Sequence, residues 1–189
     1  APTSVLIIRA QQPVASESIA RKYLRMLVPL DGSRRAENVL PMVTHLALFH
    51  QSRISIVHVV KTPEMARQMP LAREDVELSE QVVARNRQEA IRYLDQVRQH
   101  SPLEGLEVQT HLLTSDNAAA ALHELADKES IDVVALSAHG YSGYNQWPYG
   151  SMVSNFILYS KVPVLIVHDL PAKEEPTPVD MLTREHTEH

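Results

Sequence analysis

Residues 131–169 read IDVVALSAHGYSGYNQWPYGSMVSNFILYSKVPVLIVHD and hold three of the five glycines of the chain. They open with an apolar run, 131–136, that is strand-sized and rich in β-branched residues. Small and polar residues follow, and residues 151–160 then place apolar side chains at helical spacing. A second apolar run covers 162–167, with Pro163 near its start as an edge strand tolerates. The predicted order is strand, glycine loop, helix, strand.

Such a junction binds anions for a physical reason. The first backbone N–H groups of a helix have no partner inside it, and the helix dipole adds partial positive charge. Glycine lets the backbone come close to a ligand, and phosphate is the anion expected there. The chain contains neither the Gly-Lys-Ser/Thr of a P-loop nor the G-x-G-x-x-G dinucleotide fingerprint.

The glycine loop resembles a motif of the universal stress protein family. That motif is G-x2-G-x9-G-[ST], and this chain has Ser137, Gly140 and Gly150–Ser151 at the same spacing, with serine in place of the first glycine. The family also begins with a strand that ends in a Pro-x-Asp-x-Ser loop, and residues 27–33 read LVPLDGS. The resemblance extends over roughly residues 22–169 and includes the order of strands and helices.

Apolar runs that alternate with helical segments predict an α/β fold. The five predicted core strands lie at residues 25–30, 53–60, 106–113, 131–136 and 162–167. Four helical segments separate them, which is typical of a doubly wound parallel sheet with helices on both faces. By analogy with the family we expect a five-stranded sheet in the order 3-2-1-4-5. In that order the loops at Asp31 and Gly140 meet beyond the carboxyl ends of the strands, where ligands bind in such sheets.

Polar residues before two of the helical segments predict where those helices begin. Ser33, and to a lesser degree Asp31, is expected to cap the first helix, which Pro41 is expected to bend. Residues 114–116 are expected to cap a helix over residues 118–128.

Composition narrows the class of protein. The chain has 189 residues, of which 44% are hydrophobic and 22% charged, as in an ordinary soluble domain with extensions. A net charge of -5 without a basic stripe argues against nucleic acid as the main partner. The chain has no cysteine, so thiolate metal sites and disulfides are excluded. Its apolar runs are too short to span a bilayer, and no signal core is evident, so we expect a cytoplasmic protein without membrane contact.

The chain is expected to divide into three parts. Residues 1–21 form an N-terminal extension, 22–170 the universal stress protein domain, and 171–189 a tail whose proline and charge predict disorder. In the extension, residues 5–9 read VLIIR and line up with VLIVH at residues 164–168. Because tandem universal stress proteins exist, this segment is either the last strand of a preceding repeat or a chance similarity between two apolar strands.

The resemblance implies an adenine-nucleotide site that holds ATP or another adenine nucleotide, with or without Mg²⁺. Asp31 would hydrogen-bond ribose or base, Val59 would hold the adenine edge through its backbone, and Pro29 would lie under the adenine. Backbone amides of the glycine loop would hold the phosphates. The implied nucleotide-binding residues are Pro29, Asp31, Ser33, Val59, Leu136, Ser137, Gly140, Gly150, Ser151 and Met152.

These residues also have purely structural interpretations. Asp31 suits a turn and cap, and Pro29 suits the exit of the strand. Gly140 and Gly150 suit a loop that needs glycine at positive φ and a helix cap. Ser137 either crowds the ribose or hydrogen-bonds it. Trp147 and the tyrosines around it either stack on a base or anchor the loop on the domain.

The sequence predicts binding more than turnover. Efficient phosphoryl transfer needs a positioned Lys or Arg, and residues 137–160 contain neither. We therefore expect slow ATP hydrolysis at most and assign no catalytic residue, since a histidine placed like His139 more often fixes a loop. His186 and His189 stand at i, i+3 without a third ligand, so no metal site is assigned.

Three functions are compatible with these observations. The first is an ATP-binding universal stress protein that works through dimerisation and partner contacts. The second is an interaction protein of the same fold with a closed nucleotide site. The third, a hydrolase or nucleotidyl transferase, needs a base and a second pocket that the sequence does not display. In the first two, the last strand, 162–167, is expected to be an open edge that pairs with a second subunit or a tandem repeat.

Overall fold

The computed structural model describes residues 3–9, 22–63, 73–100, 103, 105–140 and 149–168. Much of the crossover before the long helix, most of the aromatic loop (141–148) and the tail lie outside the described residues. The elements are β1 (Val5–Ile7), β2 (Arg25–Pro29), α1 (Arg34–Glu37), α2 (Leu40–His50), β3 (Arg53–Lys61), α3 (Arg73–His100), β4 (Glu107–Ser115), α4 (Ala118–Lys128), β5 (Val133–Ser137), α5 (Ser151–Tyr159) and β6 (Val164–Val167).

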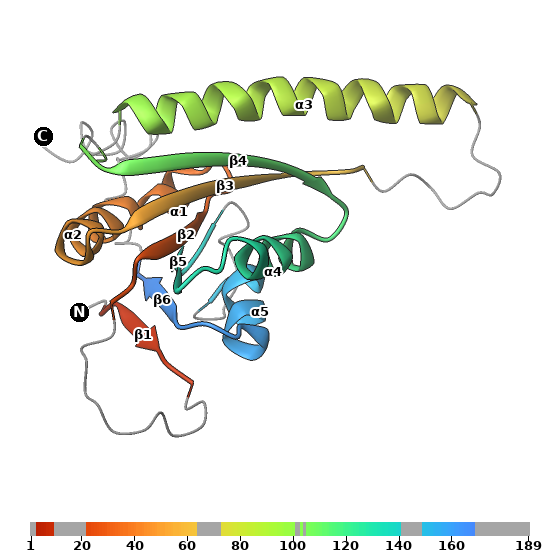
Figure 1. Ribbon diagram of the computed structural model, residues 1–189. Coiled ribbons are helices and arrows are strands. Elements are labelled where there is room, and N and C mark those ends of the chain that lie inside the picture. The colour runs from red at the N-terminus through yellow and green to blue at the C-terminus, as the bar shows by residue number, and fades with distance from the viewer. Residues whose placement is uncertain are drawn as a thin grey trace, which may run out of the picture.

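The strands form one sheet in the order β1-β6-β5-β2-β3-β4 (Figure 1). All neighbours from β6 to β4 are parallel. In order of sequence these five strands follow 3-2-1-4-5, so the predicted doubly wound α/β fold is confirmed. Among the described residues, no helix combines the length and apolar character needed to cross a membrane.

The prediction of five strands with an open last edge was wrong, because β1 adds a sixth strand. β1 pairs antiparallel with β6, with Leu6 opposite Leu165, so β6 lies inside the sheet. The guanidinium group of Arg9 donates to the backbone carbonyls of Ile157 and Leu158 at the end of α5. The last carbonyls of a helix lack partners and carry partial negative charge, so this cation stabilises the packing of residues 5–9 beside α5. The three-part division of the chain stays a prediction.

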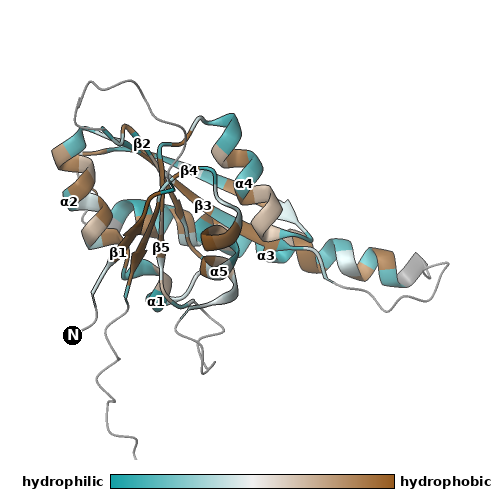
Figure 2. Cartoon of the chain, turned by 90° about the horizontal axis from the view of Figure 1, so that it is seen from below, coloured by the Kyte–Doolittle hydropathy of each residue, from teal (hydrophilic) through white to brown (hydrophobic). Residues whose placement is uncertain are grey.

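Alternation along the strands separates two hydrophobic clusters, one on each face of the sheet. In β2, Met26 and Val28 belong to the cluster covered by α1, α2 and α3, which we call the first face. Leu27 belongs to the cluster covered by α4 and α5, the second face. Figure 2 shows the apolar strands in brown between these helices. A sheet covered on both faces explains why the core strands read as near-continuous apolar runs.

The helical segment after β2, predicted to be one helix bent at Pro41, is interrupted. α1 and α2 are separate helices, and Pro41 lies in the first turn of α2, where a missing N–H leaves no helical hydrogen bond unmade. Ser33 caps α1 as predicted, since its hydroxyl accepts from the backbone N–H of Ala36 at 3.1 Å.

The predicted cap of α4 was displaced by one residue. Asn117, not residues 114–116, caps the helix, because its side-chain oxygen accepts from the Ala120 N–H at 3.0 Å. Ser115 contributes one step earlier by accepting from the Asn117 N–H at 3.1 Å. The side chains of Ser115 and Asn117 both suit an N-cap, and the path of the chain after β4 determines which of them lies at the start of α4.

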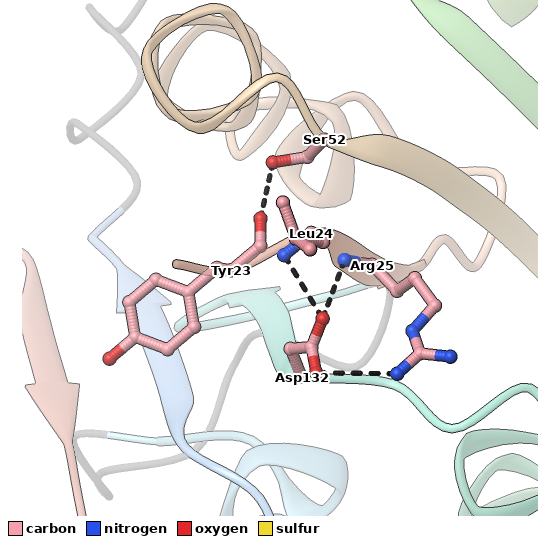
Figure 3. Close-up of polar contacts among 5 residues, drawn as sticks. All are labelled: Tyr23, Leu24, Arg25, Ser52 and Asp132. Atoms are coloured by element: carbon pink, nitrogen blue, oxygen red, sulfur yellow. Dashed lines mark hydrogen bonds and ion pairs between the residues drawn. The ribbon is translucent and has the colours of Figure 1, made fainter. Parts of the chain in front are cut away.

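Polar contacts join β2 to its neighbours at the end where the parallel strands begin (Figure 3). One carboxylate oxygen of Asp132 accepts from the backbone N–H groups of Leu24 at 3.0 Å and Arg25 at 2.9 Å. Its other oxygen lies 3.7 Å from the guanidinium group of Arg25. The hydroxyl of Ser52 donates to the carbonyl oxygen of Tyr23. These contacts fix the relative positions of the strand beginnings.

Candidate functional site

The strands β2 and β5 separate toward their carboxyl ends. Their pairing ends at Leu27 of β2 and Val134 of β5. The N–H of Leu30 donates to the Val57 carbonyl on the β3 side at 2.9 Å, so position 29 faces β5. Pro29 has no N–H to offer there, and the ladder cannot continue. A crevice therefore opens between the two strands where chain direction reverses, as the predicted strand order requires.

A cavity of about 670 Å³ lies over this crevice. Nine of the ten residues predicted from the sequence line it, namely Pro29, Asp31, Val59, Leu136, Ser137, Gly140, Gly150, Ser151 and Met152. Ser33 does not line the cavity. Its hydroxyl instead caps α1 and donates to the Asp31 carboxylate.

The loops at Asp31 and Gly140 meet, as predicted. The Oδ1 atom of Asp31 accepts from the backbone N–H of Ser33 at 2.9 Å and from its hydroxyl at 2.6 Å. A Cβ atom added to Gly140 would lie 2.1 Å from Oδ2 of the same carboxylate. Such a distance is a steric overlap, so only glycine lets the second loop come this close to the oriented carboxylate.

The structural interpretation of the loop glycines was wrong about positive φ, whereas its helix cap is confirmed at Gly150. Among the described residues, the positive-φ glycines are Gly32 and Gly105. Gly150 has φ -66° and ψ 165° and is the N-cap of α5, which begins at Ser151 as predicted. Its N–H donates to the carbonyl of Ala138 at 2.9 Å, so the loop folds back onto the end of β5. The first amides of α5 consequently lie at the cavity.

The hydroxyl of Ser137, at the end of β5, is buried at the cavity and finds no hydrogen-bond partner among the described residues. The phenol of Tyr93, on α3, also lies at the cavity and is near Glu37 and Gly32. Burial raises the pKa of the Tyr93 phenol well above its ordinary value, and the negative charges of Glu37 and Asp31 raise it further. The phenol therefore stays protonated at physiological pH.

The sequence analysis missed a wall of the cavity made by α3. Asn86, Glu89, Ala90 and Tyr93 line the cavity from that helix. The sequence predicted helical segments between the strands but not how far α3 extends over the strand ends. Lys61 also lines the cavity, from the end of β3, and is a cation outside the glycine loop.

His58 of β3, which the sequence analysis did not select, supports this wall. Its Nδ1 atom lies 2.9 Å from the carbonyl oxygen of Leu30. The centroid of its ring lies 5.8 Å from that of Tyr93. His139 lines the cavity beside the glycine loop.

The predicted loop aromatics and histidine pair lie mostly outside the described residues. Of the loop aromatics, Tyr149 lies within the described residues, and it packs against the second-face core with its ring 5.9 Å from that of His168. Trp147 lies outside the described residues, and so do His186 and His189. In the part of the chain that the structure describes, no group of three or more His, Cys, Asp or Glu could hold a metal ion.

The fold and the cavity define a class of protein: doubly wound α/β domains with a ligand crevice at the switch between the first and fourth parallel strands. The sequence profile of the universal stress protein family matches residues 22–168. Because this match covers well over half of the chain, the chain belongs to the universal stress protein family.

Individual relatives agree with this assignment. The chain is 24% identical over 150 residues to the universal stress protein YxiE of Bacillus subtilis, covering 77% of this chain and 99% of YxiE. Its fold is similar to that of the protein MJ0577, with a TM-score of 0.69, 20% identity and coverage of 80% of this chain and 100% of MJ0577. A universal stress protein solved in complex with cAMP is similar with a TM-score of 0.51, 19% identity and coverage of 78% and 98%.

Proposed function

We propose that this chain binds an adenine nucleotide, ATP in the first place, and acts as a regulatory module of a stress response in the cytoplasm. The observation that carries the proposal is the approach of Gly140 to the Asp31 carboxylate at the floor of the cavity. The cavity volume of about 670 Å³ is in the range of small-molecule sites. A family member of similar fold has been solved with cAMP, which is an adenine nucleotide.

The chemistry of the cavity walls supports such a ligand. An ionised Asp31 accepts hydrogen bonds and donates none, so it suits a ligand hydroxyl or amine and repels a phosphate. The first amides of α5, from Ser151 onward, suit the phosphates. Pro29 and Val59 offer apolar surface to a base. Mg²⁺ would reach the site with the phosphates, since the described residues supply no cluster of metal ligands.

The walls favour binding over rapid turnover. Residues 149–160 contain no Lys or Arg that could neutralise a transferring phosphoryl group. Lys61 enters the cavity from β3, away from the glycine loop in sequence. We therefore propose that bound ATP is hydrolysed slowly at most.

Calorimetric titration with ATP, with and without Mg²⁺, tests the proposal. It is preceded by denaturing extraction of the purified protein to detect nucleotide that copurifies. We expect binding that Asp31→Ala and Gly140→Val both abolish. Asp127→Ala, which removes a carboxylate paired with Lys161 instead, is the matched control and should bind as the parent does. No copurifying nucleotide and no heat at millimolar ATP would contradict the proposal and favour an interaction protein of the same fold.

A second function, in assembly, is favoured by the register of β1 on β6. The two strands carry the same three residues, Val-Leu-Ile, and pair as Val5 with Ile166, Leu6 with Leu165 and Ile7 with Val164. This pairing is self-complementary about its centre, as in a two-fold interface. We propose that β1 occupies the place where the last strand of a second universal stress protein domain would pair, in a tandem protein or in a homodimer.

Releasing β1 tests the assembly proposal. Leu6→Asp combined with Arg9→Ala should free β6 and convert a monomer to a dimer in light scattering after size exclusion. Because the chain has no cysteine, a Leu165→Cys substitution can report whether the two β6 strands meet at the centre. A released variant that stays monomeric at tens of micromolar and does not cross-link would contradict this role.

A further inference from the structure

Ser137 is unusual among the residues that line the cavity because its hydroxyl is buried without a partner. The residue is 7% exposed, and its Oγ atom makes no hydrogen bond among the described residues. A buried polar group in a native protein is normally paired, so an unpaired one at a cavity needs an explanation. A hydroxyl can both donate and accept, which distinguishes it from the acceptor-only carboxylate of Asp31.

The position of Ser137 brings it beside the Asp31 loop. Ser137 is the last residue of β5, Asp31 lies two residues beyond the end of β2, and both line the cavity. Alternation along β5 puts the Ser137 side chain on the first face, like Ala135, which is also the face of α1 and Tyr93. The serine hydroxyl and the Asp31 carboxylate thus border the crevice from its two strands.

The small exposed fraction of Ser137 also bears on whether its side chain blocks the site. Since 7% of the residue is exposed, its Cβ is packed within the fold and takes little room from the cavity. What the residue can offer a ligand in the cavity that it lines is its buried, unpartnered hydroxyl.

We propose that Ser137 is a specificity-determining residue that hydrogen-bonds a ribose hydroxyl of the bound nucleotide and so favours ribonucleotides over deoxynucleotides. The inference rests on the proposed adenine-nucleotide binding. The two hydroxyl groups of a ribose need two hydrogen-bond partners. The Asp31 carboxylate supplies an acceptor, and the Ser137 hydroxyl can either donate or accept.

The test compares the dissociation constants of ATP, 2′-deoxy-ATP and 3′-deoxy-ATP for the full chain and for Ser137→Ala. The parent should bind ATP more tightly than at least one deoxy analogue by about three- to ten-fold, the usual effect of one hydrogen bond. Ser137→Ala should weaken ATP binding by the same factor and leave that analogue unchanged, so that the preference disappears. Ser137→Gly should also lose the preference.

Thr44 supplies a matched control. It is also 7% exposed with an unpartnered buried hydroxyl, but it lies on α2 and does not line the cavity. Thr44→Val should leave the ratio of the dissociation constants at its parent value, and circular dichroism checks the fold of each variant.

Three results would overturn the inference. One is a preference for ATP over both deoxy analogues that survives in Ser137→Ala. Another is that Ser137→Ala changes the affinity for all three nucleotides by the same factor. Tighter binding of every nucleotide by Ser137→Gly would show that the serine crowds the site. In each of these cases ATP binding itself stands, whereas absence of ATP binding in the parent ends both this inference and the proposed function.

Discussion

The two ends of the parallel sheet treat their polar groups in opposite ways. Where the strands begin, Asp132 accepts two backbone N–H groups and Ser52 donates to a backbone carbonyl. Where they end, the buried hydroxyl of Ser137 has no partner among the described residues, and the residue lines a cavity of about 670 Å³. Paired groups stabilise the fold, whereas unpaired buried ones cost stability and call for an explanation.

The contrast is sharpest between two serines. Ser52 is 4% exposed and Ser137 is 7% exposed, so both are buried to a similar degree. The first has a partner within the fold and the second has none. Burial alone therefore does not show whether the fold satisfies a serine hydroxyl, and the hydrogen bonds do.

The largest expected effect is at the beginning of the strands. Asp132→Ala leaves two backbone N–H groups without their charged acceptor and should lower the free energy of unfolding by roughly 3 kcal/mol. Urea unfolding measures the loss. Asp127→Ala breaks only an exposed ion pair and should cost less than about 1 kcal/mol. Equal losses in the two variants would remove the structural role assigned to Asp132.

Next in size is the contact between the two loops at the carboxyl ends. Gly140→Ala forces a Cβ against Asp31 and should destabilise the protein by roughly 2 kcal/mol. In an Asp31→Ala background the same substitution should cost less than about 0.5 kcal/mol, because the overlapping atom is gone. Additive costs in this double-mutant cycle would argue that the two residues do not touch.

The serine pair gives a smaller and more diagnostic difference. Ser52→Ala should cost about 1 kcal/mol, because the Tyr23 carbonyl loses its donor. Ser137→Ala should leave the free energy of unfolding unchanged or raise it slightly, since it removes an unpaired hydroxyl. Chemical unfolding without nucleotide is the measurement, and a loss in Ser137→Ala as large as in Ser52→Ala would mean that Ser137 has a partner in the free protein.

The smallest effect concerns Tyr93 at alkaline pH. Its pKa is raised in the folded state, so above the ordinary tyrosine pKa of about 10 the folded chain holds a proton that the unfolded chain releases. This phenol should therefore remove up to about 1 kcal/mol of stability between pH 10 and 11, and none at neutral pH. Tyr93→Phe should lose less stability than the parent over that interval. If the stabilities of the parent and of Tyr93→Phe changed in parallel over that interval, the phenol would be in a water-like environment in the folded protein.

Much of the candidate site could be predicted because its signals are local. The spacing of Gly140 and Gly150 and the exit of the first core strand at Asp31 come from short segments of sequence. The parallel order of the five core strands then brings those segments together. Nine of ten predicted residues line one cavity for that reason. The tenth, Ser33, was selected from the same motif, but its hydroxyl is committed to Asp31 and to the cap of α1.

The amino-acid sequence by itself determined the apolar strands, the glycine loop and the start of α5 at Ser151, because each depends on the physics of a few neighbouring residues. Tertiary structure alone decided that β1 covers β6, that α3 forms a cavity wall and that Asn117 caps α4. An apolar strand pairs with a sheet edge whose backbone groups and side chains complement its own. The packing of a helix against the sheet determines which strand ends it covers. Those outcomes depend on residues distant in sequence, and so does the lack of a partner for the Ser137 hydroxyl.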